Sequence, residues 1–376
     1  MTIHEPGAVA FAKIGIALTY NRRRQIVRPT LLDNNMMSAQ PHPNKLSSSF
    51  LYYLLQTIDF NEVSAGSALP YLTIGSLNKI ALSVPCIEEQ QAIAEALGSL
   101  DDKIELNRRM NVTLEAMAQA IFCDWFVDFG PTRRKIEGAT DPVEIMGGLV
   151  SEPERALELA ELFPAQLGDN GLPEGWEAGF ASALIDFNPS EPLKKGTVAP
   201  YSDMGSLPTK GSLADRPVER AFGSGMRFRN GDALLARITP CLENGKAAYV
   251  DFLPDDVVGW GSTEFIVLRA RLPLPSSFAY LLVRHAEFLD RAITSMTGTS
   301  GRQRAQVEIL RNFMLPRASV DVFKAFGHSV EPLFDLISAN GRLNHTLAAT
   351  RDLLLPKLMS GEIRLREVER QIEEVA

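Results

Sequence analysis

Residues 93–121 read IAEALGSLDDKIELNRRMNVTLEAMAQAI, and residues 326–354 read FGHSVEPLFDLISANGRLNHTLAATRDLL. In both stretches apolar residues recur at steps of three and four. That spacing places them on one stripe of an α-helix and is typical of a coiled-coil seam. Asparagine interrupts the stripe twice in the first stretch, at Asn107 and Asn111, and twice in the second, at Asn340 and Asn344. Both stretches are therefore predicted to be long helices with related seams.

The spacing of these asparagines indicates a duplication. Asn340 follows Asn107 by 233 residues, and Asn344 follows Asn111 by the same number. Two unrelated amphipathic helices would have no reason to share both interruptions. A buried asparagine lowers the stability of a seam but fixes its register, since the amide accepts only partners that satisfy it. We expect one antiparallel pair of helices, with Asn107 and Asn111 near Asn340 and Asn344.

The duplication extends beyond the helices. FAKI at 11–14 resembles LARI at 235–238, and SSFLY at 48–52 resembles SSFAY at 276–280. Similar segments in the same order indicate two repeats with small insertions. Short β-rich runs at 9–18, 232–238 and 263–268 are separated by turn residues, and helices are predicted at 48–58 and 276–294. Each repeat therefore reads as a mixed α/β unit followed by a long helix.

The two units are unequal at their fronts. Leu172 precedes Leu235 by 63 residues, whereas Met1 precedes Phe11 by 10. The first unit is therefore expected to be incomplete at its front. The predicted divisions are a first domain at 1–86, a first long helix with an aromatic end at 87–129, a linker at 130–171, a second domain at 172–317, and a second helix with a C-terminal tail at 318–376.

Two local features modify this plan. Pro332 lies inside the apolar pattern of the second helix. Because proline is tolerated in the first turn of a helix but not in its interior, we expect a break near Val330 and a new helix from Glu331. The linker, rich in glycine and proline, is expected to be irregular apart from one short helix at 152–162.

Composition limits the class of protein. The chain has 376 residues, 45% of them hydrophobic and 22% charged, and a formal net charge of -8. No apolar run is as long as a membrane span, and no signal peptide is recognisable. The three cysteines, Cys86, Cys123 and Cys241, form no CxxC pair, which fits a reducing cytoplasm. Because proteins that bind DNA alone are usually basic, any nucleic-acid role must depend on local patches and on partners.

Several short motifs together resemble a known family, the DNA-specificity (S) subunits of type I restriction–modification systems. They are EQQAIA at 89–94, DDKI at 101–104, DWFVDF at 124–129, ELFP at 161–164, LPEGW at 172–176 and RDLLLPKLMSG at 351–361. The resemblance spans about residues 80 to 361. It implies an α+β fold: two mixed α/β target recognition domains, the first incomplete, separated by an antiparallel pair of long coiled-coil helices in a pseudo-twofold repeat.

The resemblance also implies a function. Each target recognition domain would read one half of a bipartite site in double-stranded DNA, and the helices would set the distance between the halves. The chain would position modification (methyltransferase) and restriction (endonuclease/translocase) subunits without being an enzyme itself. S-adenosylmethionine, ATP and Mg²⁺ would be cofactors of those subunits, and none would belong to this chain. The alternative is a truncated, S-like protein-interaction module without sequence-specific DNA binding.

The residues themselves show no catalytic or metal-binding pattern. HExxH, GxxxxGK[ST] and GxSxG motifs are absent, and the five histidines are dispersed. Asp101 and Asp102 are better explained as a solvated helix face beside Lys103 than as a carboxylate pair. Trp176 and Trp260 are expected to pack inside the second domain.

Basic side chains supply the candidates for DNA contact. Arginine and glutamine can bind base edges, and lysine or arginine can neutralise phosphate. A Gly/Ser/Thr loop at 298–301 precedes an Arg-Gln-Arg run and is a candidate groove probe, although a solvated turn would look the same. The candidates are Lys13, Arg22, Arg23, Arg237, Lys246, Arg302, Gln303 and Arg304.

The aromatic run after the first long helix is a candidate docking surface for a partner subunit. Its residues are Trp125, Phe126 and Phe129. The alternative is that these aromatic side chains only cap the helical bundle.

Overall fold

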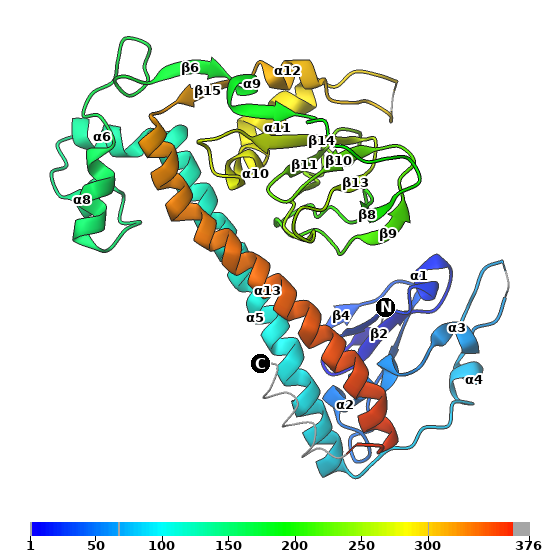
Figure 1. The fold of residues 1–376 in the computed structure, drawn as a ribbon. Coiled ribbons are helices and arrows are strands. Elements are labelled where there is room, and N and C mark those ends of the chain that lie inside the picture. The colour runs from blue at the N-terminus through cyan, green and yellow to red at the C-terminus, as the bar shows by residue number, and fades with distance from the viewer. Residues whose placement is uncertain (1, 67, 300, 364–376) are drawn as a thin grey trace. The chain divides into compact units, whose positions relative to one another are not determined.

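The computed structural model describes residues 2–66, 68–299 and 301–363 (Figure 1). The chain divides into two compact units. Unit 1 holds Met1–Asn107 and Arg342–Ala376, and unit 2 holds Arg108–Gly341. Each unit contains a β-rich domain and one part of two long helices, α5 (Ile87–Phe126) and α13 (Val320–Ser360). The predicted α+β class, with two β-rich domains and two long antiparallel helices in contact, is confirmed.

The β-rich domain of unit 1 is built on two small antiparallel sheets, with strand orders β3-β2-β5 and β1-β4. Phe11, Leu51 and Phe60 are buried between the larger sheet and helix α2. The Ser47 hydroxyl caps that helix by accepting from the Phe50 amide. The elements are β1 (Ile3–His4), β2 (Val9–Ala12), α1 (Ile16–Thr19), β3 (Arg23–Gln25), β4 (Thr30–Leu31), β5 (Met36–Ala39), α2 (Ser48–Gln56), α3 (Phe60–Val63) and α4 (Ile74–Leu77).

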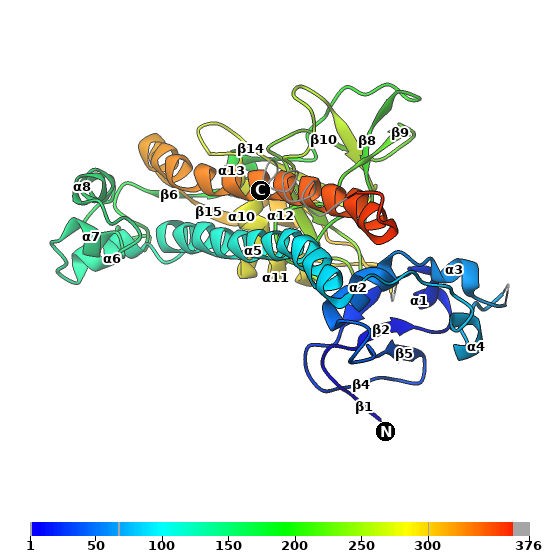
Figure 2. The ribbon, with the colours of Figure 1, turned by 90° about the horizontal axis from the view of Figure 1, so that it is seen from below.

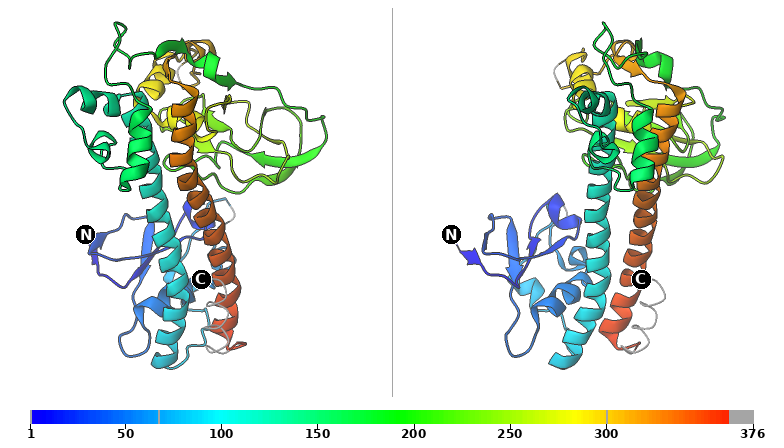
Figure 3. Two further views of the ribbon diagram at one scale, coloured as in Figure 1. Left: turned by 60° about the vertical axis from the view of Figure 1, so that its left-hand side comes forward. Right: turned by 90° about the vertical axis from the view of Figure 1, so that its left-hand side faces the viewer.

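In unit 1 the beginning of α5 packs antiparallel against the end of α13, side by side in the views of Figures 2 and 3. Asn107 is 3% exposed, and its Nδ2 donates to Asn344 Oδ1 at 2.9 Å. Apolar side chains of α2 complete the same core. The seam residues of the two long helices here are Ile93, Leu97, Leu100, Ile104, Leu347, Leu354, Leu355 and Leu358.

In unit 2 the end of α5 packs against the beginning of α13 in the same antiparallel sense. Asn340 is 7% exposed, and its Nδ2 donates to Asn111 Oδ1 at 2.8 Å. Asn111 Nδ2 in turn donates to the carbonyl of Ile337 at 3.3 Å. The four asparagines therefore pair across the helices as predicted, two in each unit.

The break expected at Pro332 is wrong, because α13 is continuous from Val320 to Ser360. Proline in a helix interior costs about 3 kcal/mol or more. Phe326, Val330 and Phe334 on either side of it are at most 3% exposed and pack into the core of unit 2. Burying this apolar stripe against α5 outweighs the missing hydrogen bond, since tertiary packing supplies most of a helix's stability.

The linker is more ordered than expected, with three short helices: α6 (Gly130–Ile136), α7 (Pro142–Ile145) and α8 (Pro153–Glu161). Arg134 holds Asp124 through two hydrogen bonds of 2.8 Å each. Lys135 Nζ donates to the carbonyls of Ala160 and Phe163, which ties α6 to α8. The sequence did not reveal these charge-assisted contacts, because each joins residues that are 10 or more positions apart.

The β-rich domain of unit 2 contains two four-stranded sheets, ordered β12-β11-β14-β7 and β10-β13-β8-β9, and the pair β15-β6. The helix expected at 276–294 is two helices, which meet at His285 in extended conformation. The elements are β6 (Glu177–Phe180), α9 (Ala181–Leu184), β7 (Ile185–Phe187), β8 (Val198–Ser202), β9 (Val218–Ala221), β10 (Met226–Phe228), β11 (Ala233–Ala236), β12 (Ala247–Tyr249), β13 (Gly259–Gly261), β14 (Phe265–Ala270), α10 (Ser277–Arg284), α11 (Ala286–Thr294), α12 (Val307–Arg311) and β15 (Met314–Arg317).

The internal repeat is visible in backbone geometry. Gly7 has φ +90 and Gly231 has φ +89, and a Cβ at either would stand 3.1 Å from a serine Cβ, Ser48 or Ser276. Around them the sheet β3-β2-β5 corresponds to β12-β11-β14, and the pair β1-β4 corresponds to β10-β13. The strands β7, β8 and β9 have no counterpart among the described residues of unit 1.

Candidate nucleic-acid interface

The candidate groove probe is a narrow loop between α11 and α12. Its stem is closed by two hydrogen bonds between the backbones of Thr297 and Arg304, of 2.9 and 3.1 Å. Arg302 lies near the tip, where it is exposed and its amide donates to the Thr299 carbonyl at 3.0 Å. Ser300 lies outside the described residues. The loop therefore holds its Arg-Gln-Arg run on a paired stem.

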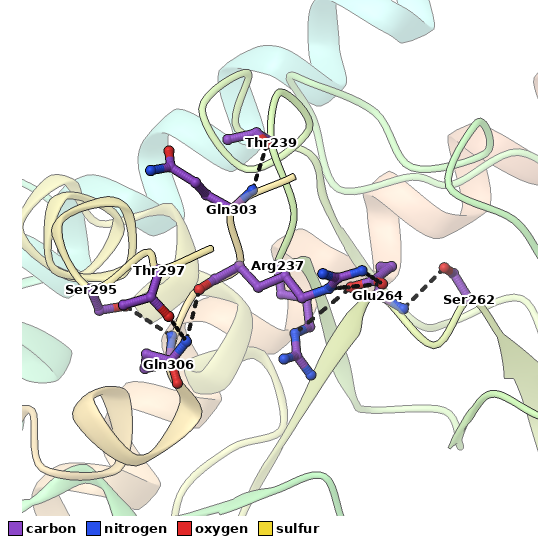
Figure 4. A network of polar contacts seen from close by, with 9 residues as sticks. Arg237, Thr239, Ser262, Glu264, Ser295, Thr297, Gln303 and Gln306 are labelled. Atoms are coloured by element: carbon purple, nitrogen blue, oxygen red, sulfur yellow. Dashed lines mark hydrogen bonds and ion pairs between the residues drawn. The ribbon is translucent and has the colours of Figure 1, made fainter. Parts of the chain in front are cut away.

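The stem packs against the segment that follows β11. The Thr239 amide donates to the Gln303 carbonyl at 3.0 Å, and the Gln303 amide donates to Thr239 Oγ1 at 3.1 Å (Figure 4). Two residues further on, the Ala305 amide donates to the Arg237 carbonyl at 2.8 Å. The structure thereby brings Arg237 together with Gln303 and Arg304, although more than 60 positions separate Arg237 from these two residues in the sequence.

Glu264 organises the charges of this cluster and was not anticipated from the sequence. Arg304 Nε donates to both Glu264 carboxylate oxygens, at 3.0 and 2.9 Å, and Arg304 Nη2 donates to one of them at 2.7 Å. Arg237 Nε lies 3.9 Å from the same carboxylate, and it is buried without a hydrogen-bond partner. In the sequence, Glu264 is a single acidic residue between two apolar segments, and nothing nearby marks it as the partner of an arginine.

These contacts change the pKa of both members of the ion pair. Hydrogen bonds from Arg304 hold the pKa of the Glu264 carboxyl below its usual value, and the same bonds raise the pKa of Arg304. Glu264 is therefore ionised at neutral pH and neutralises part of the positive charge of the cluster. Arg304 still keeps 40% of its side chain exposed, so it is available to an anionic ligand.

Lys246 is placed differently from this cluster. It begins the segment leading into β12, and its Nζ donates to the carbonyl of Met204 at 2.7 Å. The ammonium group therefore fixes the loop that precedes β9, and it is only partly exposed. No side-chain hydrogen bond or ion pair joins Lys246 to the Arg304–Glu264 pair in the described residues of unit 2.

In unit 1 the basic candidates differ in how far their side chains are exposed. Lys13 corresponds to Arg237, and its amide donates to the Asn35 carbonyl at 2.8 Å, as the Arg237 amide donates to Glu264. Lys13 is partly exposed and Arg22 is exposed, with its guanidinium 5.1 Å from the ring centre of Tyr20. These two remain available to a ligand.

The proposal of DNA contact by Arg23 needs correction. Arg23 is 4% exposed and lies 3.8 Å above the ring centre of Phe60. It donates to the backbone carbonyls of Asn21 and Ile58, and burial lowers its pKa to about 10. The guanidinium is thus a packing and cross-linking group of the first domain, because it points to the opposite side of β3 from Arg24.

The aromatic run also needs correction as a docking surface. Trp125 and Phe126 are 1% and 3% exposed. Phe126 stacks on Phe323 with ring centres 5.5 Å apart, and Trp125 meets Phe163 edge-on at 5.0 Å. Phe129 is partly buried against Trp176. These rings join α5, α13 and the linker within the chain, so a partner would have to contact other residues.

The two other tryptophans pack inside the second domain, as predicted: Trp176 and Trp260 are each 5% exposed. No three His, Cys, Asp or Glu side chains in the described ranges are arranged to hold a metal ion. No helix in those ranges is both long and apolar enough to cross a membrane.

Comparison with known proteins identifies the family. A family model described as type I restriction modification DNA specificity domain matches residues 9–116. The HindI specificity subunit of Haemophilus influenzae is 26% identical over 393 residues, covering 88% of this chain and 82% of that protein. The MjaIX specificity subunit of Methanocaldococcus jannaschii is 27% identical over 326 residues, covering 85% and 70%.

A solved structure is similar in outline: the crystal structure of the S subunit of a type I restriction–modification system from M. genitalium. It has a TM-score of 0.48 and 14% sequence identity, and the match covers 95% of this chain and 84% of that one. On the sequence matches, the chain belongs to the DNA-specificity (S) subunits of type I restriction–modification systems, which are the non-catalytic subunits of their complexes.

Proposed function

We propose that the chain recognises a bipartite site in double-stranded DNA and positions modification and restriction subunits on it. The observation that carries the proposal is the cluster of Arg237, Gln303 and Arg304 around Glu264, with Arg302 beyond it on the loop. Such a loop supplies guanidinium and amide groups that fit base edges, and charges that fit phosphate. The cluster is part of unit 2, so the second domain is proposed to read one half of the site through it.

The long helices are proposed to act as a spacer between two DNA-reading domains. A helix of 40 residues such as α5 is about 60 Å long at a rise of about 1.5 Å per residue. A chain of two repeats suits a site of two half-sites, because dimeric DNA-binding proteins match half-site spacing to their own symmetry. Lys13 and Arg22 would supply the corresponding cations of the first domain.

The partners are proposed to supply the chemistry and much of the affinity. S-adenosylmethionine would bind to the modification subunits, and ATP and Mg²⁺ to the restriction subunits. A chain with a net charge of -8 gains little from counterion release, which supplies much of the affinity for DNA. Modification subunits would therefore complete the positive surface. The three free cysteines fit work in a reducing cytoplasm, where the DNA target lies.

A DNA shift assay at about 150 mM salt tests the proposal. The chain alone should bind weakly and with little sequence preference. The chain with its modification subunit should bind one sequence class tightly, and random-sequence selection should return two fixed blocks separated by a spacer. Selection of a single block would refute the bipartite site. Binding of the modification subunit without any gain in sequence preference would favour the interaction module instead.

A further inference from the structure

The first domain leaves two strand edges open that are covered in the second. In unit 2, β7 pairs with the outer edge of β14, and β8 pairs in parallel with the outer edge of β13. The corresponding strands of unit 1 are β5 and β4. In the described residues of that unit, β5 pairs only with β2 and β4 pairs only with β1. An unpaired edge presents backbone donors and acceptors to any added strand.

Backbone register identifies the residue at the centre of the open edge. Ser38 pairs with Ala10 as Val267 pairs with Leu234, so the two occupy the same position in their sheets. The Val267 amide and carbonyl both bond to Asn188, the residue that follows β7: the amide donates to Asn188 Oδ1 at 2.9 Å, and the carbonyl accepts from the Asn188 amide at 2.7 Å. Ser38 therefore presents the same pair of groups at the outer edge of β5.

Side chains beside the second open edge are apolar and exposed. Leu31 of β4 corresponds to Trp260 of β13, since Leu31 pairs with Ile3 as Trp260 pairs with Arg227. Trp260 is 5% exposed because Tyr201 of β8 covers it, with ring centres 4.4 Å apart. Leu31 is 54% exposed and Ile3 is 58% exposed. The two residues are cross-strand partners, so an added strand on β4 would bring its side chains next to both.

A buried ion network argues against a second copy of the chain as the occupant. In unit 2 the segment between β7 and β8 is held by Glu191, which binds Arg229 and Arg269 at 2.6 Å each. Arg269 also binds Asp232, which is fully buried. Releasing this segment to another molecule would remove Glu191, which is 5% exposed, from both Arg229 and Arg269. Breaking a buried ion pair by removing one partner is strongly destabilising.

We propose that the outer edges of β5 and β4 form an addition site for an extended segment of a different polypeptide, which lays one strand antiparallel on β5 and one parallel on β4. The segment would place an asparagine-like side chain opposite Ser38 and an aromatic one over Leu31. It would need no buried acid between its strands, because the counterparts of Asp232 and Arg269 in unit 1 are Ala8 and Gln40. Main-chain pairing supplies affinity in this mode of binding, and side-chain pockets supply specificity.

The probe is a synthetic peptide with the sequence of residues 184–204, in which Glu191 is replaced by Ala. Amide hydrogen exchange of the full chain is followed with and without the peptide. Exchange at 30–31 and 36–40 should become about tenfold slower or more when the site is filled. The region of β13 and β14 should not change, since its edges are already occupied. No slowing at β4 and β5 at saturating peptide would overturn the proposal.

Two variants locate the site. Ser38→Pro removes the amide donor of the open edge and should abolish the slowing, whereas Ser38→Ala keeps that amide and should preserve it. If Ser38→Pro does not fold, Leu31→Asp is the alternative test, because it changes an exposed side chain and leaves the core intact. It should weaken peptide binding about tenfold or more. Equal binding to Leu31→Asp and to the natural chain would place the peptide elsewhere and refute the site.

Discussion

Asn107 Nδ2 donates to Asn344 Oδ1 at 2.9 Å, and the same bond recurs with the helices exchanged, where Asn340 Nδ2 donates to Asn111 Oδ1 at 2.8 Å. In both cases the donor is the more buried member, at 3% and 7% exposure. In unit 1 the donor lies on α5 and the acceptor on α13, and in unit 2 the donor lies on α13 and the acceptor on α5. The duplication read from the sequence is therefore repeated in the hydrogen bonds, one bond in each unit.

This relation predicts a double-mutant result. Asn107→Leu should lower the free energy of unfolding by about 1 kcal/mol, because Asn344 keeps a half-buried amide without its donor. Asn107→Leu with Asn344→Leu should regain that loss and exceed it, at the expense of a fixed helix register. Urea denaturation measures both, and Asn340→Leu is the matched control in unit 2. A single variant more stable than the double would contradict the prediction.

The two equivalent glycines offer a second test of the repeat. Gly7→Ala and Gly231→Ala should each cost about 1–3 kcal/mol, since an alanine there would be strained in the left-handed region and its Cβ would press on a serine at 3.1 Å. Gly196 is the control, because its φ is +87 and nothing lies within 4 Å of a Cβ built on it. Gly196→Ala therefore measures backbone strain alone. Thermal unfolding should rank it as the mildest of the three.

Sequence periodicity was sufficient to predict the two long helices and the register in which they pair. The steps of three and four define the stripe, and two asparagines at a fixed spacing allow only one antiparallel alignment that pairs them all. Continuity through Pro332 was not predictable from local rules. It depends on Phe326 and Phe334, whose burial is decided by side chains of distant segments.

The candidate site was only partly predictable. Arg23 lies in a run of three arginines that looks uniformly solvated, yet strand alternation turns Arg23 inward and leaves Arg24 outside. Its partner ring, Phe60, lies 37 positions away. Glu264 was missed for the same reason: nothing local reveals that a loop at 304 returns to pair with it. Pairings between distant segments are set by tertiary packing, which a single sequence does not display.

Two tyrosines that hold the β-rich domains to the long helices should differ in importance. Tyr280 is fully buried and donates to Glu115 at 2.6 Å, and burial raises its pKa well above the usual value. Tyr280→Phe should cost about 1–3 kcal/mol, because Glu115 loses its donor and Arg284 Nε loses the tyrosine oxygen as its acceptor. Arg284 Nε itself lies 3.9 Å from Glu115, beyond hydrogen-bond distance. Chemical denaturation monitored at tryptophans of unit 2 measures this loss.

Tyr53→Phe is the comparison in unit 1. Tyr53 donates to Asp101 at 2.8 Å, but Asp101 also binds Arg351. The carboxylate therefore keeps a partner, and the expected loss is smaller, about 1 kcal/mol. A larger loss for Tyr53→Phe than for Tyr280→Phe would show that the remaining ion pair does not compensate.

The Arg304–Glu264 pair predicts a pH dependence. The folded-state pKa of Glu264 is lowered from its ordinary value of 4.5. Its contribution to stability is therefore present above that value and is lost as the pH falls through the lowered pKa. Glu264→Gln should be less stable than the natural chain at neutral pH, and the difference should shrink in acid. Denaturation midpoints of the two proteins across this range test it, and a constant difference would exclude the carboxylate as the cause.

The two arginines of the loop should respond differently to removal. Arg304 is tied to Glu264 by three hydrogen bonds of 3.0 Å or less, so Arg304→Ala should lower the stability of the second domain as well as DNA binding. Arg302 is exposed at the tip, so Arg302→Ala should leave the melting temperature unchanged.

The effect of Arg302→Ala on DNA then identifies its role. If Arg302 reads a base, binding by the complex should fall by about 1–3 kcal/mol, with relaxed preference at one position of the site. If it neutralises phosphate, affinity should fall equally for all sequences, and the slope of log K against log salt should decrease by about one. Titrations on two oligonucleotides at several salt concentrations separate these outcomes. Unchanged affinity on both would remove the loop tip from the DNA-binding surface and leave Arg237 as the cation to test next.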